Sequence, residues 1–142
     1  MNKLLVLSVF AVLACAFAAP ATENEAAAKK SIDDAVQQCK TELNPSDNDY
    51  KILENKNQLP ANEAQKCLIE CVGKKLGEIK DGKLDHDGFI NYNKIRYADN
   101  KSKLDEAEQF FQKCQPEVEK KANEKCGAGY AMRSCLIDFF HL

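Results

Sequence analysis

The sequence has few histidines, which zinc sites and many hydrolase sites need. Its only histidines are His86 and His141, and neither belongs to a histidine pair with the spacing of a zinc site. No serine lies in the sequence context of a nucleophile elbow. We therefore expect no metal, no other cofactor and no enzymatic activity.

Long apolar runs and an excess of charge of one sign are also absent. Beyond the N-terminus, no apolar run approaches the length needed to cross a bilayer. The 20 Lys and Arg residues nearly balance the 22 Asp and Glu residues, and the formal net charge is −2. This mildly acidic balance gives no reason to expect nucleic acid or an anionic membrane as a partner.

Residues 1–19 have the features of a secretory signal peptide. Lys3 supplies the charged start, Leu4–Leu13 form an apolar run, and Ala16 and Ala18 fit a small-residue cleavage signal. The run is short for a membrane span, and a retained membrane anchor is the alternative interpretation. We therefore predict a secreted, extracellular protein whose mature chain begins near residue 20.

Cleavage of this segment removes Lys3 and Cys15. The remaining residues, 20–142, are expected to form one domain with a formal net charge of −3. They contain six cysteines in an oxidising compartment, which favours a disulfide framework over metal or redox chemistry. Six cysteines allow fifteen pairings, and their number alone does not choose among them.

Hydrophobic periodicity predicts an all-α chain of about six helices, with no convincing strand and no internal repeat. The segments expected to be helical are 32–43, 47–55, 60–76, 89–97, 102–115 and 116–135. Residues 20–30 are polar and alanine-rich and are expected to fray before the first helix. Residues 80–88 form a turn-rich connector. The tail after Cys135 is expected to fold back, either as a lid or as part of the core.

The positions of four cysteines constrain how the helices are linked. Cys67 and Cys71 lie four residues apart on one predicted helix, where their Cβ atoms point the same way, so a bridge between them is unfavourable. Each should instead reach a different element. Cys126 and Cys135 lie nine residues apart, near opposite faces of a straight helix. A helix bridged on both faces should lie between two others, so we expect the last helix at the centre of the fold.

The spacing of the six cysteines resembles that of the insect odorant-binding proteins, which carry pheromones and general odorants. Successive cysteines from Cys39 to Cys135 are separated by 27, 3, 42, 11 and 8 residues. The Leu59-Pro60 pair and the segment KKLGEIKDGKLDHDGF (residues 74–89) are similar as well, and the resemblance covers essentially the whole mature chain. It implies six helices around an apolar cavity, locked by three interlocked disulfides. The implied pairs are Cys39–Cys71, Cys67–Cys126 and Cys114–Cys135.

The resemblance implies an extracellular carrier that reversibly binds and transports small hydrophobic ligands. These are odorants or pheromones, or other lipophilic molecules if the tissue is not sensory. A membrane chemoreceptor is a further expected partner, and the chain is expected to be a monomer or a weak homodimer. With every mature cysteine bridged, no thiol nucleophile remains. The alternative is a secreted, disulfide-rich helical protein that acts on membranes or as a signal.

Apolar residues from several helices and from the tail are the candidates for a ligand-binding wall, because aromatic side chains often line pockets. For each single residue, ordinary core packing is the simpler explanation. The candidates are Leu53, Leu68, Val72, Leu76, Phe89, Ile90, Phe110, Phe111, Val118, Tyr130, Phe139 and Phe140. In addition, the hydroxyl groups of Tyr92 and Tyr130 are candidates for hydrogen bonding to an alcohol, aldehyde or ester.

One segment imitates a calcium-binding loop. In KLDHDGFINYNK, Asp85, Asp87 and Gly88 match the third, fifth and sixth positions of such a loop. Its first and twelfth positions, which need carboxylates, are Lys83 and Lys94. Two ammonium groups in place of two anionic ligands should abolish affinity for calcium, so we predict a turn there.

Overall fold

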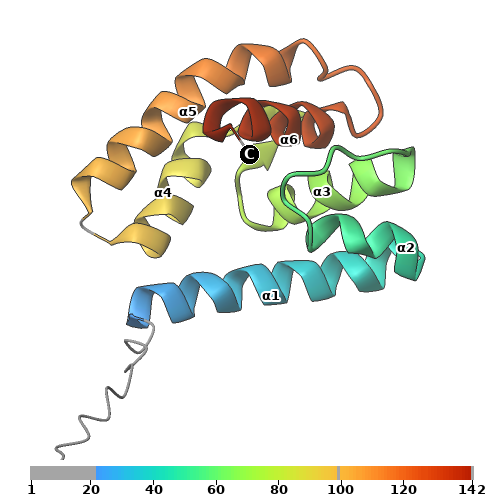
Figure 1. Ribbon diagram of the computed structural model, residues 1–142, viewed down its shortest axis with the longest axis horizontal. Coiled ribbons are helices and arrows are strands. Elements are labelled where there is room, and N and C mark those ends of the chain that lie inside the picture. Colours follow the sequence, from blue (N-terminus) through green and yellow to red (C-terminus); the bar gives the residue numbers. More distant parts are fainter. Residues whose placement is uncertain (1–21, 99, 142) are drawn as a thin grey trace, which may run out of the picture.

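The computed structural model describes residues 22–98 and 100–141 (Figure 1). The predicted signal peptide and Cys15 lie outside these residues. The described chain contains six α-helices, a 3₁₀ turn η1 (Lys51–Leu53) and two short strands, β1 (Ile79–Lys80) and β2 (Lys83–Leu84). The helices are α1 (Glu23–Leu43), α2 (Asp47–Tyr50), α3 (Glu63–Lys75), α4 (His86–Tyr97), α5 (Lys101–Glu119) and α6 (Gly127–Phe140). The predicted six-helix fold is confirmed.

The first helix begins earlier than predicted. Thr22 is its N-cap: the Thr22 hydroxyl accepts a hydrogen bond from the Glu25 N–H (3.2 Å), and the Glu25 carboxylate accepts one from the Thr22 N–H (2.9 Å). This capping box satisfies two N–H groups that would otherwise lack partners, and the alanines that follow favour helix. The prediction that residues 20–30 fray is therefore wrong from Glu23 onward. The helix ends, as predicted, before Pro45, with Asn44 in the left-handed conformation.

The start of α3 also differs from the prediction. Asn62 is the N-cap, and its side-chain oxygen accepts a hydrogen bond from the Gln65 N–H at 2.9 Å. Pro60 therefore precedes the helix and does not lie in its first turn. At the other end, α3 stops just before Gly77, as predicted. The φ of Gly77 is 80°, in the left-handed region that glycine adopts easily.

The connector after α3 contains a small hairpin that periodicity did not predict. Strands β1 and β2 pair antiparallel, with Ile79 opposite Leu84, and Asp81-Gly82 form the turn with φ values of 51° and 73°. Asp-Gly is a typical hairpin turn because both residues tolerate positive φ. Asp85, the best match to a calcium ligand, instead caps α4 by accepting a hydrogen bond from the Gly88 N–H at 2.9 Å. Within residues 22–98 and 100–141, no group of three or more His, Cys, Asp or Glu side chains is placed to hold a metal ion.

The boundary between the last two helices was predicted wrongly. Pro116 does not begin a helix but lies inside α5, which continues to Glu119; α6 begins only at Gly127. Proline normally breaks a helix because it lacks an N–H group. Here the apolar stripe of α5 continues past it, since Cys114 and Val118 are both fully buried, and this burial favours an unbroken helix.

The C-terminal tail is helical. Helix α6 continues past Cys135 to Phe140, and His141 closes it in the left-handed conformation with φ 52°. The tail therefore does not fold back after Cys135, but the alternative that it completes the core is confirmed for Phe139. Continuation of the helix places Phe139 against the core, while Phe140 remains 40% exposed.

The disulfides confirm the implied pairing. Cys39–Cys71 joins α1 to α3, Cys67–Cys126 joins α3 to the start of α6, and Cys114–Cys135 joins α5 to α6. Cys67 and Cys71 therefore belong to different bridges. Helix α6 lies between α3 and α5, as predicted, whereas α1 runs along the edge of the molecule (Figure 1). The prediction placed both Cys126 and Cys135 on the last helix. In the structure Cys126 is the N-cap of α6, so only Cys135 lies on the helix itself.

A glycine allows α3 and α6 to approach closely. A Cβ atom on Gly129 would lie 2.6 Å from the backbone nitrogen of Glu70 and 2.7 Å from the backbone oxygen of Lys66, which is too close for any side chain. The N–H of Gly129 donates a hydrogen bond to the Glu70 carboxylate at 3.2 Å. The side chain of Cys126 accepts no hydrogen bond from the first turn of α6. The Glu70 carboxylate of α3 instead accepts one from a backbone N–H group of that turn.

The buried side chains form two clusters. The aliphatic cluster (Cys39, Ile52, Leu68 and Ile69) lies among α1, η1 and α3. The second cluster lies among the β-hairpin, α4, α5 and α6, and its centre is a group of phenylalanines that we call the aromatic cluster. Its members are Phe89, Phe110, Phe111, Phe139 and Phe140.

Candidate functional site

A cavity of about 90 Å³ opens beside the aromatic cluster, among α4, α5, α6 and the residue Glu78. Five of its lining residues are aromatic and two are aliphatic; they are Phe89, Tyr92, Tyr97, Phe110, Phe140, Ala107 and Leu136. The polar lining residues are Glu78, Asn93, Arg96, Lys103 and Glu106. The cavity thus combines an apolar wall with a small number of polar groups, as ligand sites commonly do.

Helical periodicity explains why these residues share one space. The lining residues of α4 follow Phe89 at intervals of three, four, seven and eight, and those of α5 follow Lys103 at intervals of three, four and seven. Leu136 and Phe140 are four residues apart on α6. Residues at these intervals lie on one face of a helix, so three faces from three helices meet at the cavity.

The aromatic wall is built around Phe110. Its ring stacks on Phe89, with centroids 5.5 Å apart and an interplanar angle of 16°, and on Phe140 at 6.1 Å and 17°. Phe139 meets Phe110 edge-on at 5.5 Å. These separations lie in the favourable range for aromatic pairs. Phe140 is the exposed member of this group, so the end of α6 forms the outer part of the wall.

Glu78 places a carboxyl group at the cavity. Its backbone is fixed on both sides: its N–H donates to the Gly73 carbonyl at 2.8 Å, and its carbonyl accepts from the Asp85 N–H at 2.9 Å. Within the described chain, no side chain lies within hydrogen-bonding or ion-pairing distance of its carboxyl oxygens. Burial raises the pKa of Glu78 to about 7, and Arg96 opposes this rise only in part. Burial, and next the charge of Glu78, raise the pKa of Tyr92 to about 12.

The other polar lining residues have partners that define what they offer to a ligand. The Asn93 amide nitrogen donates to the Phe89 carbonyl at 2.8 Å, which turns the Asn93 amide oxygen away from that carbonyl. Lys103 forms an ion pair with Glu106 at 2.8 Å. Arg96 is exposed, and its guanidinium lies over the Tyr97 ring, 5.0 Å from the centroid.

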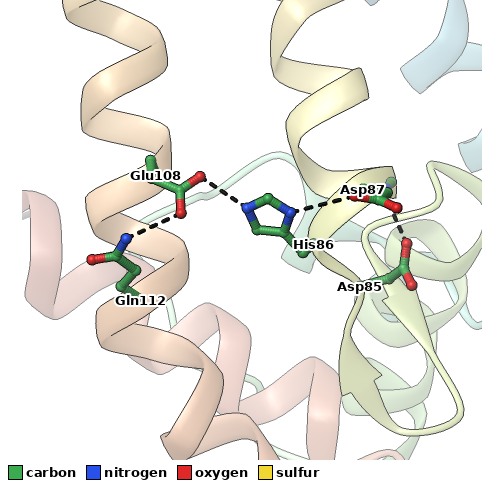
Figure 2. Close-up of polar contacts among 6 residues, drawn as sticks. Asp85, His86, Asp87, Glu108 and Gln112 are labelled. Atoms are coloured by element: carbon green, nitrogen blue, oxygen red, sulfur yellow. Dashed lines mark hydrogen bonds and ion pairs between the residues drawn. The ribbon is translucent and has the colours of Figure 1, made fainter.

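A polar cluster outside the cavity fastens α4 to α5 (Figure 2). His86 Nε2 lies 3.0 Å from a Glu108 oxygen, and its Nδ1 lies 3.4 Å from Asp87; Gln112 donates to the second Glu108 oxygen at 3.1 Å. The hydrogen bond to Glu108 is the largest cause of a raised pKa for His86, and the same bond lowers the pKa of Glu108. The His86 ring also meets Phe111 edge-on at 4.8 Å. This exposed cluster therefore holds the N-terminal end of α4 against the α5 wall.

The structure brings together only some of the predicted site residues. Phe89, Phe110 and Phe140 line the cavity, as does Tyr92, whereas Ile90, Phe111, Val118 and Phe139 pack in the surrounding core. Leu53, Leu68 and Val72 belong to the aliphatic cluster or pack against it. Leu76 lies in a groove between α1 and α4, and Tyr130 lies in a surface groove with Lys66 over its ring. The ligand-binding role of every one of these residues stays a prediction.

Sequence reasoning missed the polar lining residues and also Tyr97, Ala107 and Leu136. The helical spacing of the lining residues on α4 and α5 was an available signal, because both lining faces follow intervals of three, four, seven or eight residues. These faces mix charged and aromatic residues, so a search for apolar stripes passes over them. Glu78 gave no signal of this kind because it lies in a connector, one residue after Gly77.

Comparison with known proteins identifies the family. The PBP/GOBP family matches residues 21–138. The chain belongs to the PBP/GOBP family. General odorant-binding protein 19d of Drosophila melanogaster is 29% identical over 126 residues, which cover 87% of this chain and 81% of that protein. The family resemblance predicted from the cysteine spacing is therefore confirmed.

Solved structures show the same fold. Odorant-binding protein dmelOBP28a from Drosophila melanogaster is 25% identical with a TM-score of 0.62, covering 81% of this chain and 93% of that one. The fatty acid binding protein OBP56a from the oral disk of the blowfly Phormia regina has a TM-score of 0.62 at 18% identity, and the match covers 80% of this chain and 91% of that one. This second similarity shows the fold alone.

As a member of the PBP/GOBP family, the chain is a carrier of small hydrophobic ligands. Members of this family are odorant carriers that are typically secreted and are not known as enzymes. Within residues 22–98 and 100–141, no helix combines the length and the apolar character that crossing a membrane requires.

Proposed function

We propose that this PBP/GOBP member is secreted and carries small odorant- or pheromone-like molecules reversibly through extracellular fluid. The observation that carries the proposal is the aromatic cavity among α4, α5 and α6. The signal-like residues 1–19 and the three disulfides, which suit an oxidising compartment, support secretion. A membrane chemoreceptor as recipient and a monomeric or weakly dimeric state remain predictions.

The size of the cavity indicates how larger ligands enter. A volume of about 90 Å³ is smaller than that of most drug-sized ligand sites. A larger odorant must therefore displace part of the wall. Phe140 is the part that moves in this proposal, because it is 40% exposed and occupies the last turn of α6.

Two neighbouring phenylalanines give a matched test of the cavity. Phe110 is 3% exposed and Phe111 is 5% exposed, but only Phe110 lines the cavity. Phe110→Ala and Phe111→Ala should each destabilise the protein, by roughly 3–5 kcal/mol where the ring is fully buried. Only Phe110→Ala should also weaken binding of the fluorescent probe N-phenyl-1-naphthylamine, by about tenfold or more.

The measurement is probe fluorescence at a temperature at which both variants are folded, judged by far-ultraviolet circular dichroism. The wild-type chain should bind the probe with micromolar affinity, about −8 kcal/mol. Native mass spectrometry of the secreted protein should show a co-purified small molecule. Failure of the wild-type chain to bind the probe, or equal losses of affinity in the two variants, would contradict the proposed site.

A further inference from the structure

We propose that the polar end of the cavity binds the ammonium group of a small alkylamine, with Glu78 and Asn93 as its hydrogen-bond acceptors. The alkyl group would lie against Phe89 and Phe110. This inference rests on the proposed carrier function and adds the chemical class of a ligand.

The first argument is the kind of polar group that faces the cavity. Glu78 offers carboxyl oxygens that no described side chain binds, on a backbone fixed by two hydrogen bonds. The Asn93 amide must place its nitrogen toward the Phe89 carbonyl, since a carbonyl only accepts, and its oxygen is thereby left as an acceptor. An ammonium group has up to three N–H donors and no acceptor, so it complements these two groups.

The second argument is the aromatic wall. Phe89, Tyr92, Tyr97 and Phe110 surround the same space, and the faces of such rings attract cations. A carboxylate within a group of aromatic rings therefore favours an organic cation on two independent grounds. The small cavity volume, about 90 Å³, favours an amine with a short alkyl chain.

The charges around Glu78 leave it as the anion available to such a ligand. On α5, Glu106 is already bound by Lys103 at 2.8 Å. On α4, Arg96 lies over the Tyr97 ring without a carboxylate in ion-pairing distance within the described chain, and Tyr92 is neutral because its pKa is raised to about 12. Helix α6 contributes only Leu136 and Phe140 to the wall. An anionic ligand at this end of the cavity would be attracted by Arg96 but repelled by an ionised Glu78, and the Asn93 oxygen would offer it no hydrogen-bond donor.

The experiment compares n-butylamine, 1-butanol and butanoic acid, which have similar lengths but offer a cation, a hydroxyl and an anion. Binding is measured by NMR chemical-shift titration of the full mature protein at pH 6 and pH 8. At pH 8, n-butylamine should bind about tenfold or more tightly than either competitor. Its affinity should rise about tenfold from pH 6 to pH 8, because Glu78 ionises near pH 7 while an alkylammonium keeps its charge up to about pH 10.

Two variants separate Glu78 from the general charge of the protein. Glu78→Gln keeps the size of the side chain and should abolish both the preference for the amine and its pH dependence. Glu119→Gln, the same change at an exposed residue of α5 outside the cavity, should keep both. Tighter or equal binding of 1-butanol or butanoic acid, or unchanged amine affinity in Glu78→Gln, would overturn the inference and leave the carrier function intact. Absence of binding by all three compounds and by N-phenyl-1-naphthylamine would instead overturn the carrier function.

Discussion

The two clusters of this protein differ in the type of side chain that they contain and in how completely they are shielded from solvent. The aliphatic cluster contains Ile52 and Leu68, which are 1% and 0% exposed, and the Cys39–Cys71 bridge crosses it. The aromatic cluster borders a cavity, and one of its members, Phe140, is 40% exposed. The aliphatic cluster is therefore closely packed, whereas the aromatic cluster borders the cavity that we propose as the ligand site.

The disulfides follow the same division. Cys39–Cys71 lies within the aliphatic side and Cys114–Cys135 within the aromatic side, whereas Cys67–Cys126 joins the two sides through α3 and α6. A cavity lowers the number of packing contacts, and cross-links that restrict the unfolded chain offset that loss.

The largest expected loss of stability comes from removing the Cys67–Cys126 bridge, which joins the aliphatic cluster to the aromatic cluster. Replacing Cys67 and Cys126 by serine should lower the free energy of unfolding by about 4 kcal/mol, because this bridge links residues 59 positions apart. The shorter Cys39–Cys71 bridge, at 32 positions, should contribute slightly less when removed in the same way. Urea denaturation measures both losses. A loss below about 1 kcal/mol for the joining bridge would show that packing alone holds the sides together.

A change within the aliphatic cluster should affect stability without affecting binding. Leu68→Ala should lower the free energy of unfolding by about 3 kcal/mol, since Leu68 is fully buried and lies outside the cavity wall. The affinity of the folded variant for N-phenyl-1-naphthylamine should equal that of the wild type. If Leu68→Ala weakened probe binding as much as Phe110→Ala does, the division into a packing side and a binding side would be wrong.

The stability of the protein should depend on pH through Glu78, which lines the cavity beside the aromatic cluster. Its folded-state pKa of about 7 exceeds the ordinary value of 4.5, so between these values the folded state holds a proton that the unfolded state has lost. Stability should therefore fall as pH rises from about 5 to 8, by at most about 3 kcal/mol from this group. Glu78→Gln should remove that slope in urea denaturation curves recorded at several pH values.

His86 provides the control for this measurement. Its pKa is raised by the hydrogen bond to Glu108, so the stabilisation from this pair is complete below the ordinary pKa of 6.5 and is lost as pH rises through the folded-state value. His86 and Glu78 therefore both lower the free energy of unfolding as pH rises. A His86→Gln variant should keep the slope due to Glu78, and a slope that vanished in His86→Gln but persisted in Glu78→Gln would reverse the assignment.

A smaller effect is expected where the two sides touch. Gly129→Ala would place a Cβ atom 2.6 Å from the α3 backbone, so α6 must shift away from α3. This overpacking should lower the free energy of unfolding by about 2 kcal/mol, and Gly129→Ser should lower it further. Thermal unfolding followed by circular dichroism measures both. Equal stability of the alanine variant and the wild type would show that the helices are not held at this distance.

Local patterns predicted much of the fold. The cysteine spacing led to the family and to all three bridges, and the apolar periodicity from Ile32 to Leu43 located most of α1. Signals of the same kind were present where the predictions were wrong. Thr22 and Glu25 form a capping box, and Asp81-Gly82 form a hairpin turn. These features depend on residues within a few positions of one another.

By itself, then, the sequence determined most of the helical segments and the family, because apolar periodicity and cysteine spacing are properties of positions along the chain. The pairing of the cysteines was implied by the family resemblance. Only the tertiary structure decided that α5 continues through Pro116, since the burial of Val118 outweighs the local preference of proline. It also decided that Phe110 lines the cavity while its neighbour Phe111 packs behind it, against His86. It placed the carboxyl of Glu78, a connector residue, against faces of α4 and α5 that are distant in sequence. The physical reason is that helical spacing fixes which residues share a face, whereas the side chains opposite that face are set by how the helices pack.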